Sequence, residues 1–152
     1  MAMRIASWLL PAACAALAAF AGSAHAAEFK SVGAAPAVMF DAPTERGRKM
    51  FIAPRGMPVE VILSYGDWVK VRDVAGDLSW VEARALDARR VLIVTVASAK
   101  VQAAPDAASP VVFSADRGVL LELAEPIASS WIRVRHRDGQ SGYVRAADVW
   151  GD

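Results

Sequence analysis

Apolar residues recur at every second position along several short segments of this chain. Val59, Val61 and Leu63 follow this spacing, and residues 68–72 repeat it as Trp-Val-Lys-Val-Arg. A period of two is typical of a β-strand with one buried face, and helical spacing fits neither segment. Turn-forming residues separate the segments, at Pro54-Arg55-Gly56, Tyr65-Gly66-Asp67, Ala75-Gly76-Asp77 and Asp138-Gly139. Short strands with frequent turns predict a small all-β barrel or sandwich.

The pattern occurs twice at a nearly constant offset, which indicates a duplicated unit. Arg55-Gly56 aligns with Arg117-Gly118. After one extra residue near Ser129, the segment Trp68-Val69-Lys70-Val71-Arg72 aligns with Trp131-Ile132-Arg133-Val134-Arg135. Residues 36–88 and 98–151 are therefore predicted to form two tandem repeats.

Residues 89–97 lie between the repeats and are predicted to be a connecting strand or linker. Their apolar segment, Val91-Leu92-Ile93-Val94, contains no Gly, Ser or Pro, which indicates a buried strand or a rigid connector. A repeat of this size buries only a modest core. We therefore expect the two repeats to pack on each other through this segment.

Residues 1–26 have the pattern of a secretory signal peptide. A basic start at Arg4 precedes an apolar run, Ile5–Phe20, and the segment ends in Ala24-His25-Ala26. Cleavage is expected after Ala26. The alternative is an uncleaved membrane anchor, which is disfavoured because the apolar run is shorter than the about 20 residues of a membrane span. No second long apolar run follows, so no stable span is expected after cleavage.

Composition argues against a disulfide and against nucleic acid or anionic lipid as a partner. Cys14 is the only cysteine and would leave with the signal peptide, so the fold is expected to contain no disulfide. The formal net charge is +1, and loss of Arg4 would make the remaining chain neutral. A neutral chain has no overall attraction for nucleic acid or anionic lipid, and neither is expected as a partner.

Three sequence elements follow one another in a recognisable order. They are Arg55-Gly56-Met57-Pro58-Val59-Glu60-Val61, Trp68-Val69-Lys70-Val71-Arg72 and Trp80-Val81. In this order they resemble the bacterial SH3 (SH3b) domain family, and in particular exported proteins with two such repeats. Ser79 stands where the family usually has the Gly of a Gly-Trp-Val motif, whereas Gly142 keeps that Gly before Tyr143.

The resemblance implies an all-β protein with two tandem SH3-like small β-barrels after the signal peptide. Each barrel would be partly open, with about five strands. A short helical turn is expected near Ala83–Leu86 and again near Arg145–Asp148. The family is associated with the cell envelope, where its domains are thought to bind peptidoglycan stems or protein partners.

Residues that support catalysis are scarce after the signal peptide. His136 is the only histidine there, and the absence of cysteine excludes a Cys–His nucleophile. No His-Glu-x-x-His or Gly-x-Ser-x-Gly motif is present. Asp67, Asp73 and Asp77 lie at predicted turns, where Asp is favoured for its turn chemistry. We therefore expect no enzyme, no metal site and no cofactor.

Aromatic and basic residues form the candidate ligand site. Alternation places Trp131, Arg133 and Arg135 on one face of a predicted strand. Aromatic rings stack on sugars or other rings, and Arg side chains hold carboxylates through two hydrogen bonds. The alternative is that the tryptophans only cover the end of a barrel. The predicted ligand-binding residues are Trp80, Tyr143, Trp131, Arg133, Arg135 and Arg145.

Together these features predict a non-catalytic, exported binding module of the cell envelope that recognises peptidoglycan or another envelope ligand. The alternative is an interaction adaptor that binds a peptide segment of an envelope protein partner. Its location is expected to be periplasmic or otherwise extracytoplasmic. The second repeat is favoured as the binding repeat, because it keeps Gly142-Tyr143 and carries the denser basic stripe.

Overall fold

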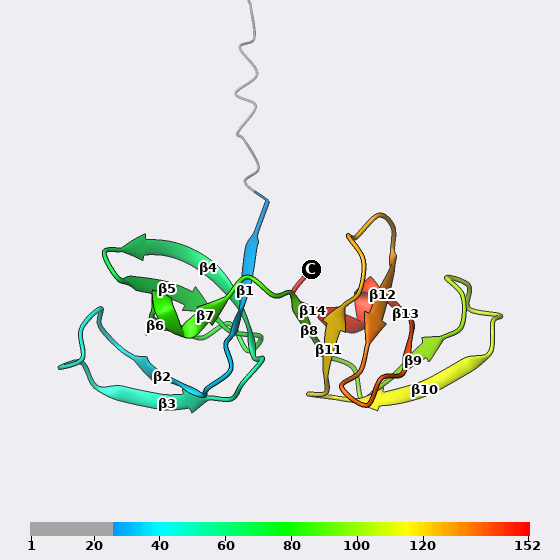
Figure 1. Ribbon diagram of the computed structural model, residues 1–152, viewed down its shortest axis with the longest axis horizontal. Helices are drawn as coiled ribbons and strands as arrows, with labels where there is room; N and C mark the ends of the chain where they lie inside the picture. The colour runs from blue at the N-terminus through cyan, green and yellow to red at the C-terminus, as the bar shows by residue number, and fades with distance from the viewer. Residues whose placement is uncertain (1–25) are drawn as a thin grey trace, which may run out of the picture.

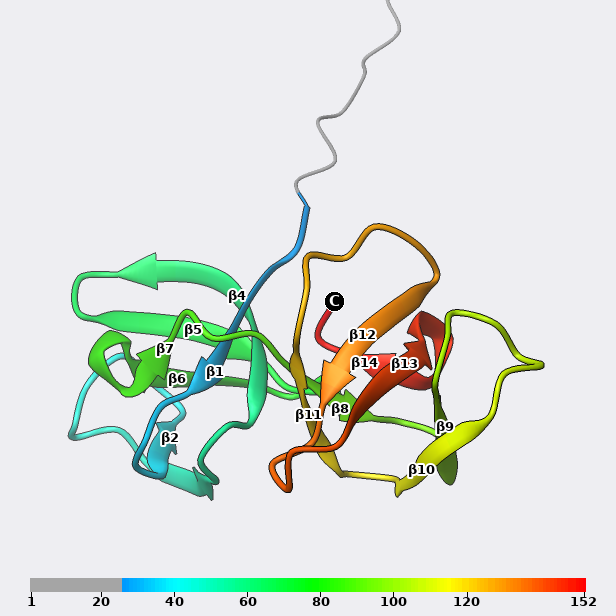
Figure 2. The ribbon, with the colours of Figure 1, turned by 45° about the vertical axis from the view of Figure 1, so that its right-hand side comes forward.

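The protein forms two all-β units that lie side by side, with the C-terminus at their junction (Figures 1 and 2). This computed structural model describes residues 26–152, so the predicted signal peptide, except for Ala26, lies outside the described residues. Each unit is one antiparallel sheet of seven strands. The predicted all-β fold of two tandem SH3-like domains is confirmed. No helix in the described residues is long and apolar enough to cross a membrane.

The first unit has the strand order β3-β2-β6-β5-β4-β1-β7. A 3₁₀ turn over Ala83–Ala85 precedes the last strand, as the resemblance implied. The strands are β1 (Glu28–Val32), β2 (Ala37–Phe40), β3 (Lys49–Ala53), β4 (Pro58–Tyr65), β5 (Trp68–Arg72), β6 (Leu78–Glu82) and β7 (Leu86–Asp87).

The second unit repeats this topology in the order β10-β9-β13-β12-β11-β8-β14. Its 3₁₀ turn spans Ala146–Asp148, again where the resemblance implied one. The strands are β8 (Val91–Val94), β9 (Ser98–Gln102), β10 (Val111–Asp116), β11 (Leu120–Leu123), β12 (Trp131–Arg135), β13 (Ser141–Arg145) and β14 (Val149–Trp150).

Each unit has seven strands instead of the expected five or so. One reason is that each begins with a strand that precedes the repeat boundaries drawn from the sequence: β1 in the first unit and β8 in the second. The segment 91–94, for which a connector was an open alternative, is strand β8. It pairs with β11 and β14 of the second sheet.

Each unit encloses its own hydrophobic core, built mainly from small branched side chains. Val32, Met39, Val59 and Val81 are among the buried residues of the first core. Leu92 and Val94 of β8 pack inside the second core. Two of the four side chains of residues 91–94 therefore point into the interior of the second unit, as expected for the buried-strand alternative.

Strand alternation holds in most strands but breaks in β4. The pairing of β4 with β5 shifts between Val61 and Leu63, so that one residue of β4 has no partner. Such a bulge reverses the facing of the residues that follow it. Leu63, expected on the same face as Val59 and Val61, is 45% exposed, whereas Val59 is fully buried.

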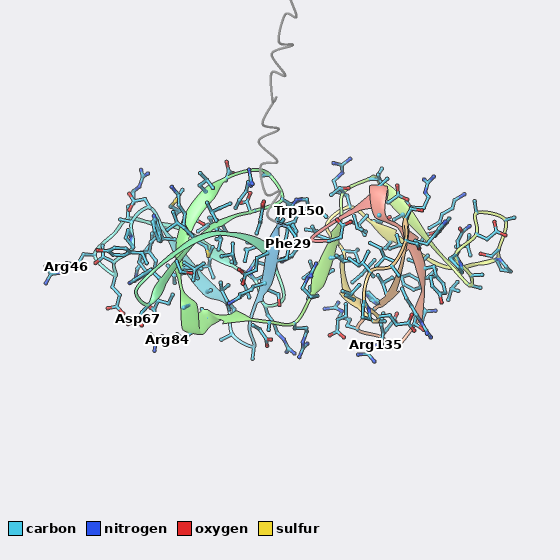
Figure 3. The ribbon with its side chains drawn as sticks, turned by 90° about the horizontal axis from the view of Figure 1, so that it is seen from above. Phe29, Arg46, Asp67, Arg84, Arg135 and Trp150 are labelled. Carbon is cyan, nitrogen blue, oxygen red and sulfur yellow. The ribbon has the colours of Figure 1, made fainter. Side chains whose placement is uncertain are left out.

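Side chains from both units hold the junction together. The rings of Phe29 in β1 and Trp150 in β14 meet edge to face, with centroids 5.1 Å apart (Figure 3). The Arg90 guanidinium lies 5.6 Å from the Phe29 ring centroid and donates a hydrogen bond of 2.7 Å to the carbonyl oxygen of Gly151. The Ser31 hydroxyl donates to the carbonyl oxygen of Arg89 at 2.7 Å. These contacts fix the two units relative to each other.

Candidate functional site

Five of the six predicted ligand-binding residues lie together on the outer face of β12 and β13. Trp131 is directly opposite Arg145, and Arg133 is directly opposite Tyr143. Residues that face each other across antiparallel strands point to the same side of the sheet, as do alternate residues along one strand. Arg135 therefore shares this side with the other four. We call this group of five residues the outer face of the second unit.

The other side of the same strands is buried. Ile132 and Val134 of β12 and Val144 of β13 are at most 1% exposed and form part of the second core. The predicted alternation along β12 is thus confirmed. Because the core residues are fixed, the outer-face side chains have a defined spacing along a rigid sheet.

Each arginine of the outer face has a carboxylate partner. Arg133 Nη1 lies 2.6 Å from Glu125 Oε1, and Arg135 Nη2 lies 3.0 Å from Glu122 Oε2. Arg145 Nε lies 3.2 Å from Asp148 Oδ2. The hydrogen bond to Glu125 raises the pKa of Arg133, and the hydrogen bond from Arg135 lowers the pKa of Glu122.

These ion pairs leave the arginines accessible. The side chains of Arg133 and Arg135 are 43% and 60% exposed. Ion pairs in contact with water contribute only about 0–1 kcal/mol. A ligand carboxylate can therefore replace an internal partner at little cost.

The sixth residue, Trp80, lies in the first unit and belongs to a different surface. It is directly opposite Phe40 on one side and Lys70 on the other. Lys70 Nζ lies 6.0 Å from the Trp80 ring centroid, and the Phe40 and Trp68 rings meet edge to face at 5.3 Å. Trp68 and Trp80 are both half-buried. The first unit thus carries three aromatic side chains here, one more than the second unit has at the aligned positions.

The two units differ in aromatic content at the position of Phe40. The aligned residue in the second unit is Gln102, and its backbone pairs with Tyr143. The Gln102 side chain is buried, and its Nε2 donates to the carbonyl oxygens of Ala107 and Ser109 at 3.0 and 3.4 Å. Its amide therefore holds the loop between β9 and β10 and adds no aromatic surface beside Tyr143.

The described residues form a hollow between the two units and another in the first unit, which Trp68 helps to line. A cavity of about 550 Å³ lies between the two units, and its lining includes Ser31, Arg55, Arg89, Glu122, His136 and Arg137. A second hollow of about 380 Å³ lies at the outer end of the first unit, beside Arg46 and Asp67 (Figure 3). The sequence did not predict the first cavity, because only the packing of the two units creates it. A signal for it in the sequence was Arg89, a basic residue at the boundary of the repeats that lines the cavity.

His136 has the surroundings of a structural residue. Its ring lies 5.9 Å from the Phe113 ring, and its Nδ1 lies 3.0 Å from Asp138 Oδ2. The backbone hydrogen bond from Gln140 is the main cause that lowers the pKa of Asp138. Residues 26–152 contain no cluster of three or more His, Cys, Asp or Glu side chains that could hold a metal ion.

Comparison with known proteins gives one family and a distant fold likeness. The bacterial SH3 domain matches residues 33–88 and, a second time, residues 96–151. No curated protein matches the chain. NlpC2 from Trichomonas vaginalis is 11% identical, with a TM-score of 0.39, over 84% of this chain and 49% of its own. An NlpC/P60 family protein from Bacillus cereus is 17% identical, with a TM-score of 0.36, over 80% of this chain and 55% of its own.

The chain thus spans about half the length of these solved structures, and likeness at this level carries no information about activity. The family match is stronger, because it covers most of the chain and its two segments fall on the two sheets. Bacterial SH3 domains are typically non-catalytic binding modules, and they occur in extracytoplasmic proteins. The chain therefore belongs to the bacterial SH3 domain family, of which it carries two tandem copies.

Proposed function

We propose that this protein is an exported, non-catalytic module that binds peptidoglycan of the cell envelope through the outer face of its second unit. Export rests on the signal-peptide pattern of residues 1–26. The envelope as its place of action rests on membership of the bacterial SH3 domain family.

The observation that carries the proposal is the grouping of two aromatic rings and three guanidinium groups on one exposed side of β12 and β13. Trp131 and Tyr143 present ring faces and edges on which a sugar can stack. Arg133, Arg135 and Arg145 can bind the carboxylates of stem peptides through paired hydrogen bonds. This face therefore has aromatic groups for the sugars and arginines for the stem peptides of peptidoglycan.

The test is co-sedimentation of the protein with purified sacculi over a range of salt concentrations. The variant Arg133→Ala/Arg135→Ala removes two guanidinium groups from the outer face. The matched control is Lys70→Ala/Arg72→Ala, which removes the two cations at the equivalent positions of β5 in the first unit. Thermal unfolding of each variant checks that the fold is retained.

The proposal predicts sedimentation that weakens as salt increases, because exposed charges are screened. The second-unit variant should lose most of this binding, and the first-unit control should keep it. Equal binding by both variants would show that the outer face is not the site. If the unaltered protein fails to sediment at low salt, a protein partner replaces peptidoglycan as the leading proposal.

A further inference from the structure

The cavity of about 550 Å³ between the units is walled by both of them. The first unit contributes the turn that follows β1 and the Arg55-Gly56 turn between β3 and β4. The second unit contributes the turn at residues 118–120 and the His136-Arg137 turn that follows β12. A volume of this size is within the range of about 300–1,000 Å³ that is typical of small-molecule sites. It is larger than a single ion or water cluster requires.

The cationic groups in this cavity outnumber the available carboxylates. Arg55, Arg89 and Arg137 all line it, with Asp87 and Glu122 as the acidic groups. Glu122 is already held by Arg89 at 3.1 Å and by Arg135 at 3.0 Å. The Asp87 Oδ1 accepts a hydrogen bond of 2.8 Å from the backbone N–H of Arg89.

Arg55 and Arg137 differ from the arginines of the outer face in one respect. Neither forms an ion pair with a carboxylate anywhere in residues 26–152. They lie in turns that belong to different units, and both line the cavity. The lining therefore includes two arginines that have no carboxylate partner within the described residues.

The walls of the cavity are held in place without a ligand. Gly56 and Gly118 both have positive φ, of 80° and 86°, and shape the two turns. The Gly56 turn packs close to the second unit, since a Cβ there would lie 3.4 Å from Leu120 Cδ1. The contact between Phe29 and Trp150 fixes the units from another side. A site fixed in this way avoids much of the ordering cost of binding.

Apolar side chains complete the lining. Val32 and Val91 are buried beside the cavity, and Val119 and Leu120 are half-buried. A ligand that combines carboxylates with an aliphatic part matches this lining. A short acidic peptide has both features and has a size that suits the volume.

We propose that the cavity between the units binds a short acidic peptide, with Arg55 and Arg137 each holding one carboxylate. This site is separate from the outer face and does not depend on the proposed function. One link joins the two, because Glu122 lines the cavity and also pairs with Arg135. For this reason the variants that test the cavity leave Arg133 and Arg135 unchanged.

The test is isothermal titration calorimetry on the protein purified after expression of the full chain. The probe is the N-acetylated dipeptide Ala-Glu with two free carboxylates. The same dipeptide with both carboxylates amidated, and glutarate as a free dicarboxylic acid, are the comparison ligands. Arg55→Ala and Arg137→Ala remove the two guanidinium groups, and Arg117→Ala is the matched control, because it aligns with Arg55 but does not line the cavity.

Each cavity variant should weaken binding of the acidic dipeptide by roughly ten- to a hundredfold, as expected for loss of hydrogen bonds to a charged group. Arg117→Ala should bind the acidic dipeptide as tightly as the unaltered protein does. The amidated dipeptide should bind to neither of these two proteins. No binding of the dipeptide at millimolar concentration would overturn the proposal. Equal loss with Arg117→Ala would overturn it as well, because binding would then reflect net charge. Glutarate binding as tightly as the dipeptide would refute the peptide as the ligand class.

The two proposals fail independently. Sedimentation with sacculi that is lost in the outer-face variant and kept in Arg55→Ala would support the proposed function, whatever the calorimetry shows. Conversely, dipeptide binding that survives Arg133→Ala but not Arg137→Ala would support the cavity alone. Thermal unfolding of Arg55→Ala and Arg137→Ala should match the unaltered protein, since both side chains are exposed.

Discussion

Replacing Gly142 with Ala should strongly destabilise the second unit. Gly142 lies in β13, and a Cβ at this position would be 2.6 Å from the carbonyl oxygen of Gln102 and 2.8 Å from Val101 Cγ1. Ordinary van der Waals contacts are 3.4–4 Å. Both neighbours belong to β9, which is buried here, so neither can move aside cheaply. The new methyl group must push β13 away from β9.

The size of the effect follows from this overlap. Inserting an extra carbon into a well-packed interior typically costs about 1–3 kcal/mol. The upper part of this range applies, because one of the two contacts is with backbone and the other with a fully buried side chain. For a domain of this size, each kcal/mol lowers the melting temperature by roughly 4–8 °C. A loss of about 2–3 kcal/mol should therefore lower the melting temperature of the second unit by roughly 10–20 °C.

Differential scanning calorimetry of the unaltered protein and the variant measures this shift. The control is Ser79→Ala, because Ser79 occupies the equivalent position of the first unit and already has a Cβ. It adds no atom, so its effect should be clearly smaller. A melting temperature of Gly142→Ala within about 2 °C of the unaltered protein would refute the close approach of β13 to β9.

The remaining predictions concern the junction and the pH dependence of stability. Trp150→Ala should cost about 0.5–1.5 kcal/mol through loss of the ring contact with Phe29, and should increase the radius of gyration in small-angle X-ray scattering. The control is Trp68→Ala, which is remote from the junction and should leave that radius unchanged. An unchanged radius in Trp150→Ala would contradict the role of Trp150 in fixing the two units relative to each other. Glu122→Gln should lower the melting temperature at neutral pH, because the hydrogen bond from Arg135 lowers the pKa of Glu122 and so stabilises the folded protein above the ordinary carboxyl pKa of 4.5. This contribution is lost as the pH falls through the lowered pKa that Glu122 has in the folded protein. In strong acid, Glu122→Gln and the unaltered protein should therefore have the same melting curve. A difference that persists there would mean that the effect is not electrostatic.

The repeat and the strand pattern were sufficient to predict the architecture. Residues 68–72 and 131–135 each alternate without interruption, and both form regular strands with one buried side. The outer face was largely predictable for the same reason, since alternation alone places Trp131, Arg133 and Arg135 on one side. The facing of Leu63 was not predictable, because a bulge depends on how β4 pairs with β5 and leaves no clear mark in the local sequence.

The sequence by itself determined which residues turn, which alternate and which repeat, because these properties depend on near neighbours along the chain. Tertiary structure alone decided what those residues meet. It gave Arg133 and Arg135 their carboxylate partners, and it made Gly142 necessary through the backbone of β9. It also brought Arg55 and Arg137 to one cavity. Contacts between distant segments depend on how whole sheets pack, and a pattern with a period of two carries no information about that packing.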